Sequence, residues 1–291
     1  MKVVILGASG QIGNTLYEAL SKKYEMTGTS RRPRAKLLQF DPFMDHWSVL
    51  GRPAVIINTI GQIDASRDYS FARIHLDLTK RIIENRSVLG NPRIIQVSAL
   101  GASANHEVQF LRTKGEADDY LTQFPDVAVI RPSIVCTHRT MIVKKMLMLL
   151  RISKWTGGIV VVPRGFSERQ IQPVMAEDVA AIVDKLCSAH EIPKALNLTG
   201  PERLSFHRII KMMFEAQGRK HRIVQIPKFW TDILARYLVG AFFPSVINAQ
   251  QYELLFKDNV ADHSEAQEYL GRPLQHTKDF WIKEFSDYAP D

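Results

Sequence analysis

The chain has 291 residues, long enough to bury a large core and to form one or two domains. Its apolar share of 45% is ordinary for a globular protein, and no apolar run reaches the roughly 20 residues that span a bilayer. The net charge of +8 suits an anionic ligand or surface. No compact basic run flanked by stacking aromatic residues is present, which argues against nucleic acid as a partner.

Cysteine content and the first residues bear on the compartment. The two cysteines, Cys136 and Cys187, suit a reducing environment and do not indicate a metal site. The first residues read as a core strand rather than as a signal peptide. We therefore expect a cytoplasmic protein without a metal ion, which could lie at the periphery of a membrane.

A short apolar run at 3–6 leads directly into a glycine-rich turn, Gly-Ala-Ser-Gly-Gln-Ile-Gly at 7–13, and then into an amphipathic stretch. This order is typical of dinucleotide-binding folds: Gly7 permits a tight turn, Gly10 lets the backbone approach a pyrophosphate, and Gly13 lets the helix lie close to the strand. The helix N-terminus offers N–H groups and a positive dipole end to phosphates. We expect the binding residues here to be Gly7, Ser9, Gly10, Gln11, Ile12 and Gly13.

The first 140 residues alternate between strand-like and helix-like segments, which predicts a parallel sheet covered on both faces. We expect strands at 2–6, 25–30, 37–41, 54–59, 93–98 and 127–131, and helices at 12–23, 69–87 and 108–123. Pro132 prevents the last of these strands from continuing.

The pattern changes after residue 140. We expect helices at 141–150, 177–188 and 205–217, and strands at 157–163 and 195–199. The predicted fold class is α/β, a Rossmann-type doubly wound parallel sheet with a smaller C-terminal α/β lobe. We assign 1–140, with returning elements at about 157–200, to the dinucleotide-binding domain, and about 141–156 and 201–291 to a smaller substrate or partner lobe.

The residues after the second strand bear on which nicotinamide cofactor would bind. Proteins selective for NAD usually present Asp or Glu there to the ribose 2′-hydroxyl, but this chain has Arg31, Arg32 and Arg34 and no acid in that window. Guanidinium groups pair well with a 2′-phosphate, so the sequence favours NADP(H) over NAD(H) through Arg31 and Arg32. A solvated basic loop is the alternative.

Nearly the whole chain resembles the atypical short-chain dehydrogenase/reductase superfamily, in the branch of an accessory subunit of respiratory complex I and its bacterial relatives. The residues that carry the resemblance are the three glycines, Asp41, Asn58–Gly61, Val97–Ala102, Phe110–Lys114, Ile130–Ser133, Gln172–Val174, Leu198–Glu202 and Asp258–Val260. The resemblance implies further cofactor contacts from Asp41, Thr59, Gly61, Lys114 and Pro132, and a serine that orients the substrate oxygen, for which Ser98 and Ser103 are the candidates.

One position breaks the resemblance. The superfamily carries its chemistry on a Tyr-x-x-x-Lys helix, in which the lysine holds the nicotinamide ribose and the tyrosine exchanges a proton with the substrate. Here Lys114 is present, but Phe110 stands four residues before it, and no Tyr-x-x-x-Lys occurs anywhere in the sequence. The usual acid/base is therefore missing. His106 is a weak substitute candidate, and Cys136 could line the pocket.

The segment 229–249 is the most hydrophobic part of the second half, and apolar residues at 230, 233, 234, 237 and 238 share one helical face. This segment either packs within the protein or contacts a protein partner or a membrane surface, where aromatic and basic residues meet anionic headgroups.

Three functions remain open. The first is an NADP(H)-binding protein without the catalytic tyrosine that has a structural, assembly or sensing role in a partner complex. The second is an NADPH-dependent reductase or epimerase of a small substrate that works without the tyrosine, in which Lys114, His106 or a bound water moves the proton and Ser98 is a candidate to orient the substrate oxygen. The third is an NmrA-like regulator that responds to the ratio of oxidised to reduced cofactor.

Overall fold

The computed structural model describes residues 1–61, 70–137, 140–227, 229–230 and 253–287. Its centre is a seven-stranded sheet whose strand pairs are all parallel. In spatial order the strands are β11 (Ala195–Leu198), β6 (Val127–Pro132), β5 (Arg93–Val97), β4 (Val55–Asn58), β1 (Lys2–Leu6), β2 (Glu25–Ser30) and β3 (Leu38–Gln39). The chain therefore runs outward from β1 to one edge and then returns to build the other half, which confirms the doubly wound prediction.

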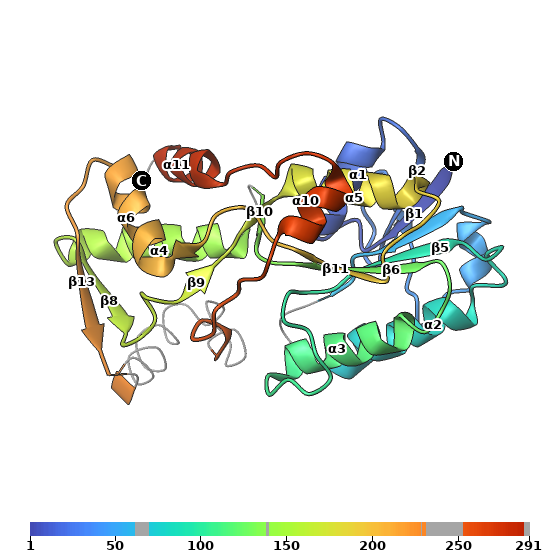
Figure 1. The fold of residues 1–291 in the computed structure, drawn as a ribbon, viewed down its shortest axis with the longest axis horizontal. Helices are drawn as coiled ribbons and strands as arrows, with labels where there is room; N and C mark the ends of the chain where they lie inside the picture. The colour runs from blue at the N-terminus through green and yellow to red at the C-terminus, as the bar shows by residue number, and fades with distance from the viewer. Residues whose placement is uncertain (62–69, 138–139, 228, 231–252, 288–291) are drawn as a thin grey trace.

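Helices cover both faces of this sheet (Figure 1). Because successive strand residues point to opposite faces, Val3 and Ile5 pack in one core cluster and Val4 and Leu6 in another. The first cluster includes α1 (Gln11–Leu20) and α5 (Ala176–Ser188). The second cluster lies under α2 (Leu78–Glu84) and the end of α3 (Gln109–Leu121). The continuous apolar strands of the sequence are thus buried on both sides.

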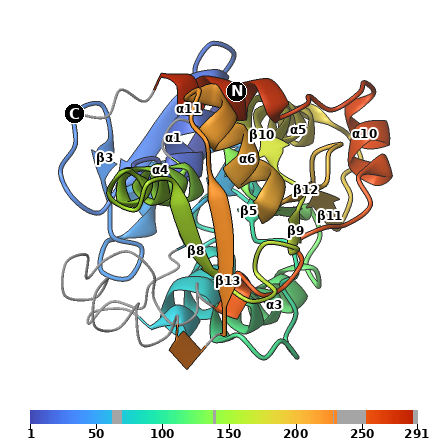
Figure 2. The same ribbon diagram turned by 90° about the vertical axis from the view of Figure 1, so that its left-hand side faces the viewer.

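A smaller lobe extends from the carboxyl end of the sheet (Figures 1 and 2). Its helices and its paired parallel strands share a third apolar cluster. The elements are α4 (Met141–Trp155), β8 (Ile159–Pro163), α6 (Phe206–Ala216), β13 (Arg222–Ile226) and α11 (Lys278–Ser286). Short strand pairs join lobe and sheet, namely β7 (Val135–Cys136) with β10 (Val174–Met175) and β9 (Gln170–Ile171) with β12 (Leu204–Ser205).

Two elements pack away from the unit to which we assigned them. β8 lies within 157–200, yet it pairs with β13 and its buried valines belong to the lobe cluster. α10 (Ser264–Leu270) lies within 201–291, yet its Ala266 is buried in the cluster of the large sheet, next to α5. Long-range partners decide both placements, and the periodicity of a segment contains no record of its partner.

The helix expected at 69–87 is irregular in its described part. A π-helical segment, η2 (Arg73–Asp77), precedes α2, which ends at Glu84. Residues 62–69, between β4 and this segment, lie outside the described residues, as does most of 229–249. Within the described ranges, no helix is long and apolar enough to cross a membrane.

Candidate functional site

The glycine turn at the carboxyl end of β1 is closed by its own backbone. Gly7 has a φ of +82°, a region that favours glycine, and the N–H of Gly10 donates to the carbonyl oxygen of Gly7 at 2.9 Å. A Cβ on Gly13 would lie 2.6 Å from Oγ1 of Thr59 and closer still to the Gly7 carbonyl oxygen. The sequence therefore needs glycine at 13 for the helix to approach the strand.

The N-terminus of α1 has the properties of an anion site. Gly10 precedes the helix in an extended conformation without a side-chain cap, and the first turn contains no acidic residue. The first N–H groups of a helix have no intrahelical acceptor, so those of Gln11, Ile12 and Gly13 can meet a phosphate. The Gln11 side chain points elsewhere, because its Nε2 donates to Oγ1 of Thr137 at 2.7 Å. Ser9 is half-buried within the turn.

Thr59, directly after β4, supports the turn rather than standing free. Its hydroxyl donates to the Leu6 carbonyl oxygen at 2.8 Å and lies 3.3 Å from that of Gly7. Gly61, two residues later, is exposed, and Pro132 ends β6 at the same edge of the sheet. The ends of β1, β4 and β6 thus bring their predicted residues to one edge, as expected of parallel strands.

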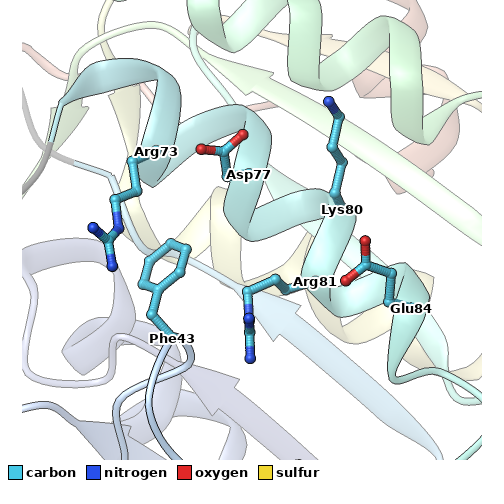
Figure 3. A pocket seen from close by; sticks show the side chains of 6 residues that line it. All are labelled: Phe43, Arg73, Asp77, Lys80, Arg81 and Glu84. Atoms are coloured by element: carbon cyan, nitrogen blue, oxygen red, sulfur yellow. The ribbon is translucent and has the colours of Figure 1, made fainter.

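The arginines after β2 lie at the same carboxyl end of the sheet, on the side formed by β2 and β3. Arg31 and Arg32 are exposed, and Asp41, after β3, is half-buried. Oδ1 of Asp41 accepts from the N–H of Phe43 at 2.9 Å, which fixes the loop. Beside this loop is a surface depression of about 430 Å³, lined by Phe43, Arg73, Asp77, Lys80, Arg81 and Glu84 (Figure 3). Phe43 lies beneath the guanidinium of Arg73, with 4.8 Å from Cζ to the ring centroid.

Phe110 and Lys114 lie one helical turn apart on α3, and both are buried. Nζ of Lys114 is 5.7 Å from the Phe110 ring centroid and donates to the Val97 carbonyl oxygen at 3.4 Å. Burial lowers the pKa of Lys114 from 10.5 to about 8, and the nearby carboxylate of Asp118 partly opposes this shift. Phe110 packs in a small apolar cluster with Phe71, Val108 and Leu111.

Ser98 uses its hydroxyl on a buried carboxylate. It donates to Oδ2 of Asp118 at 2.9 Å, and Nε of Arg131 donates to the same oxygen at 2.7 Å. Burial nevertheless raises the pKa of Asp118, because the hydrogen bonds and charge of Arg131 only partly offset desolvation. In this arrangement Ser98 is a support for Asp118, and its predicted catalytic role remains a prediction.

The other candidates are occupied or packed. Nδ1 of His106 accepts from the N–H of Val108 at 3.0 Å, at the start of α3. Ser103 is exposed in the preceding loop, and Cys136 is buried in the lobe cluster, where burial raises the pKa of its thiol. Among the residues that the structure describes, no group of three or more acidic, histidine or cysteine side chains could hold a metal ion.

His75 was missed by the sequence analysis, which did not include it among the candidate site residues. It lies in η2 with only 3% of its surface exposed, and its ring is 5.6 Å from that of Phe110. Nδ1 is 2.8 Å from Oγ1 of Thr113, which lies next to Lys114 in α3. Burial and the charge of Lys114 lower the pKa of His75 from 6.5 to about 3, so the imidazole is neutral. The available signal was the placement of an imidazole between two apolar residues, Ile74 and Leu76.

Solved structures share this architecture over almost their whole length. UDP-glucuronic acid 4-epimerase from Bacillus cereus, in complex with UDP-glucuronic acid and NAD, has a TM-score of 0.72 at 14% identity and covers 98% of each chain. RMD from Pseudomonas aeruginosa, complexed with NADPH, has a TM-score of 0.68 at 14% identity and covers 99% of each chain. These likenesses show that the chain has the Rossmann-type fold of proteins whose structures hold NAD or NADPH.

No protein-family model matches the chain, but several curated proteins are similar to it in sequence. The chain is 23% identical to the NADH-ubiquinone oxidoreductase 40 kDa subunit of Neurospora crassa, over 89% of this chain and 71% of that protein. It is 27% identical to NADH dehydrogenase (ubiquinone) 1 alpha subcomplex subunit 9 of Arabidopsis thaliana, over 77% of this chain. The chain is similar in sequence to these subunits over most of its length.

The curated relatives differ from this chain in length and in stated compartment. The chain spans 60% of the Arabidopsis thaliana protein and 46% of the corresponding subunit of Rattus norvegicus, to which it is 28% identical. The names of all three relatives place them in mitochondria. The cytoplasmic location of the present chain remains a prediction.

The residues at this edge fit a nicotinamide dinucleotide. Gly10 and the N-terminus of α1 suit a pyrophosphate, and Lys114 supplies a cation 3.2 Å from the point that a Cβ on Gly61 would occupy. Nε2 of His75 is buried without a hydrogen-bond partner among the described residues, so the pocket holds an unsatisfied polar atom. Such a ligand supplies hydride chemistry when it is bound, whereas a proton donor at position 110 is lacking.

Proposed function

We propose that this chain is an NADP(H)-binding protein that does not use the cofactor for ordinary carbonyl chemistry. Its role is structural, or concerns assembly or sensing, within a complex with another protein. The observation that supports this proposal most directly is the position of Phe110. It packs in an apolar cluster one helical turn before the buried Lys114, in a chain whose glycine turn is intact. A phenyl ring has no proton to exchange, so this arrangement keeps the binding elements and lacks the acid.

In this proposal the cofactor lies along the carboxyl ends of the strands. The pyrophosphate meets the turn from Gly7 to Gly13, and the adenosine half extends towards Asp41 and the arginines. Thr59 and Gly61 line the middle of the site, while Lys114 and Pro132 flank the nicotinamide half. A tyrosine-to-phenylalanine variant of the Bacillus cereus epimerase has also been solved in complex with NAD, so that protein holds the dinucleotide without one of its tyrosines.

The preference for NADP(H) over NAD(H) rests on Arg31 and Arg32. Both are exposed directly after β2, and Asp41 is the first acidic residue to follow them. A guanidinium group forms charge-assisted hydrogen bonds with a 2′-phosphate, whereas an acid would select the free 2′-hydroxyl. A ratio of NADPH to NADH affinity well above one is the expected result.

The partner would be a protein assembly, because the curated relatives are named as subunits of NADH-ubiquinone oxidoreductase or NADH dehydrogenase. The lobe has several large apolar side chains exposed for such contact. Trp155 is 92% exposed and Phe229 is 66% exposed, and Ile159 and Val161 face outward from β8. Large exposed aromatic residues are enriched at protein interfaces. The rest of the candidate segment 229–249, beyond Trp230, lies outside the described residues.

A reductase or epimerase that works through Lys114 is the second candidate. The pKa of Lys114 is lowered to about 8, so a fraction of the amine is neutral near physiological pH and could accept a proton. This function predicts oxidation of NADPH with some small substrate and loss of that activity in Lys114→Ala. An NmrA-like sensor, the third candidate, predicts clearly different affinities for NADP⁺ and NADPH.

A cofactor titration of the purified chain tests the proposal. We expect NADPH to bind in the micromolar range or tighter, with no consumption of NADPH when the protein is incubated with nucleotide sugars and small carbonyl compounds. Mass spectrometry of the protein as isolated should show whether nucleotide is retained from the expression host. Absence of affinity for both NADPH and NADH would overturn the proposal, and steady turnover would favour the enzyme.

A further inference from the structure

The imidazole of His75 is held in one orientation by a neighbouring helix. Its Nδ1 is 2.8 Å from Oγ1 of Thr113. The Thr113 hydroxyl itself donates to the Gln109 carbonyl oxygen at 3.0 Å, so Oγ1 accepts from Nδ1–H of the histidine. The neutral ring therefore carries its hydrogen on Nδ1 and presents a lone pair at Nε2. That atom is buried and has no hydrogen-bond partner in the described ranges.

Lys114 faces the same space with hydrogens to donate. Nζ makes a hydrogen bond of 3.4 Å to the Val97 carbonyl oxygen, and an ammonium group has three donors. A Cβ built on Gly61 would lie 3.2 Å from this nitrogen and 3.9 Å from Nε2 of His75. Because residue 61 is glycine and is exposed, a ligand atom can approach a point between the two nitrogens.

The two nitrogens select one kind of polar group. A phosphate or carbonyl oxygen could accept from Lys114 but could not donate to Nε2, and an amide nitrogen could donate but not accept. An O–H group, of a ligand or of water, does both, since its oxygen accepts from Nζ while its hydrogen is donated to the imidazole. Burial makes such a match important, because a buried polar atom without a hydrogen-bond partner destabilises the folded protein.

We propose that His75 is a positioning residue for the nicotinamide half: the ribose hydroxyl that the resemblance assigns to Lys114 lies in the space beside Gly61 and donates its hydrogen to Nε2 of His75. This inference rests on the proposed cofactor binding and adds a residue that fixes the nicotinamide half. The contact needs an acceptor and no acid, and a neutral histidine beside Phe110 supplies the acceptor. His75 and Thr113 then act together, because Thr113 sets the hydrogen on the other nitrogen.

A matched pair of variants tests the acceptor. His75→Asn places a polar atom near Nδ1 and can keep the Thr113 contact, but removes the atom at Nε2, whereas His75→Gln can place an amide oxygen there. We expect His75→Asn to weaken NADPH binding about tenfold and His75→Gln to stay within about threefold of wild type, as measured by isothermal titration calorimetry. Gly61→Ala, which fills the space with a methyl group, should weaken NADPH binding at least as much as His75→Asn.

Adenosine 2′,5′-bisphosphate, which lacks the nicotinamide riboside, separates this inference from the proposed function. Its dissociation constant should be the same for wild type and all three variants. If wild type binds neither compound, the proposed function fails. If wild type binds NADPH and both His75→Asn and Gly61→Ala bind it equally well, the ribose contact is refuted. If every variant bound NADPH and adenosine 2′,5′-bisphosphate more weakly by the same factor, His75 and Gly61 would have a structural role, and the ribose contact would also be refuted.

Discussion

The two ends of the candidate site are built differently. The phosphate end consists mainly of backbone, with Gly7 in a left-handed conformation and Gly13 too close to Thr59 to accept a side chain. The nicotinamide end consists of buried side chains on two helices, namely Phe110 and Lys114 on α3 and His75 on η2. A backbone site tolerates sequence change around it, whereas a side-chain site loses its chemistry with one substitution.

This difference explains how binding and turnover can become separate properties in one fold. Phosphate affinity comes from a helix N-terminus and a turn, which need glycines and no acid or base. Proton transfer needs one group of suitable pKa at one point, and here the side chain at that point is a phenyl ring.

Adding a single methyl group at Gly13 should have the largest effect. In Gly13→Ala the new Cβ would lie 2.6 Å from Oγ1 of Thr59 and still closer to the Gly7 carbonyl oxygen, so α1 must move away from the strand. We expect a loss of about 1–3 kcal/mol in the free energy of unfolding, measured in urea, together with loss of detectable NADPH binding.

Gly10→Ala is the matched control for that variant. Its Cβ would meet only the Gly7 carbonyl oxygen, at 3.2 Å, and the φ of −76° suits alanine. The variant should unfold within about 1 kcal/mol of wild type but still bind NADPH poorly, because the methyl group lies where the backbone approaches the pyrophosphate. Unchanged NADPH binding in Gly10→Ala would place the phosphates elsewhere.

The phosphate end was predictable because its signal is local. Gly7, Gly10 and Gly13 lie within seven residues, and each has a steric reason that holds for any chain in that turn. The parallel sheet followed equally well from the alternation of strands and helices. Asp41 and Arg31 could be placed at the same edge, because parallel strands bring their carboxyl ends together.

The nicotinamide end was only half predictable. Position 110 was readable because it is four residues from Lys114, but His75 is 39 positions before that lysine and meets it only through helix packing. The bond between Ser98 and Asp118 was hidden for the same reason, since it joins a strand end to the far turn of α3. Likewise, β8 could be recognised as a strand, but its pairing with β13 depends on residues some 60 positions later.

Replacing the buried Lys114 by methionine should raise the free energy of unfolding, and this gain should shrink as the pH rises. The folded-state pKa of Lys114 is about 8, against 10.5 in the unfolded chain, so between these values the unfolded state binds more protons. Wild-type stability therefore rises with pH across this window relative to Lys114→Met, by about 1–3 kcal/mol in total.

Urea unfolding of both proteins at several pH values from 7 to 10 measures this difference. Lys80→Met, which removes a half-exposed lysine on α2, reports on the general loss of a cation. If Lys114→Met differs from wild type by the same amount at every pH, the ammonium is not desolvated in the folded protein. NADPH affinity should fall in Lys114→Met, whereas the affinity for adenosine 2′,5′-bisphosphate should not.

A charge change at the adenosine end should affect one cofactor alone. Arg31→Gln removes a guanidinium from the exposed end of β2 without disturbing the core. We expect NADPH to bind about tenfold more weakly and NADH to bind as before, since only NADPH carries the 2′-phosphate. Arg34→Gln, in the same loop, is the control. Equal weakening of both cofactors would mean that Arg31 contributes general electrostatic attraction and no selectivity.

Restoring a phenol should have the smallest effect on binding. In Phe110→Tyr the new hydroxyl enters the region of Lys114 and His75, where a net hydrogen bond of about 0.5–1.5 kcal/mol is offset by desolvation. If His75 already accepts from the ribose hydroxyl, the phenol has little left to satisfy, and the NADPH dissociation constant should change by less than about threefold.

Phe110→Leu tests whether the ring matters only as packing, because it empties part of the apolar cluster and should cost about 1 kcal/mol of stability. A tenfold gain of NADPH affinity in Phe110→Tyr would instead show that the nicotinamide end is an unfinished site, in which the missing phenol limits both binding and chemistry.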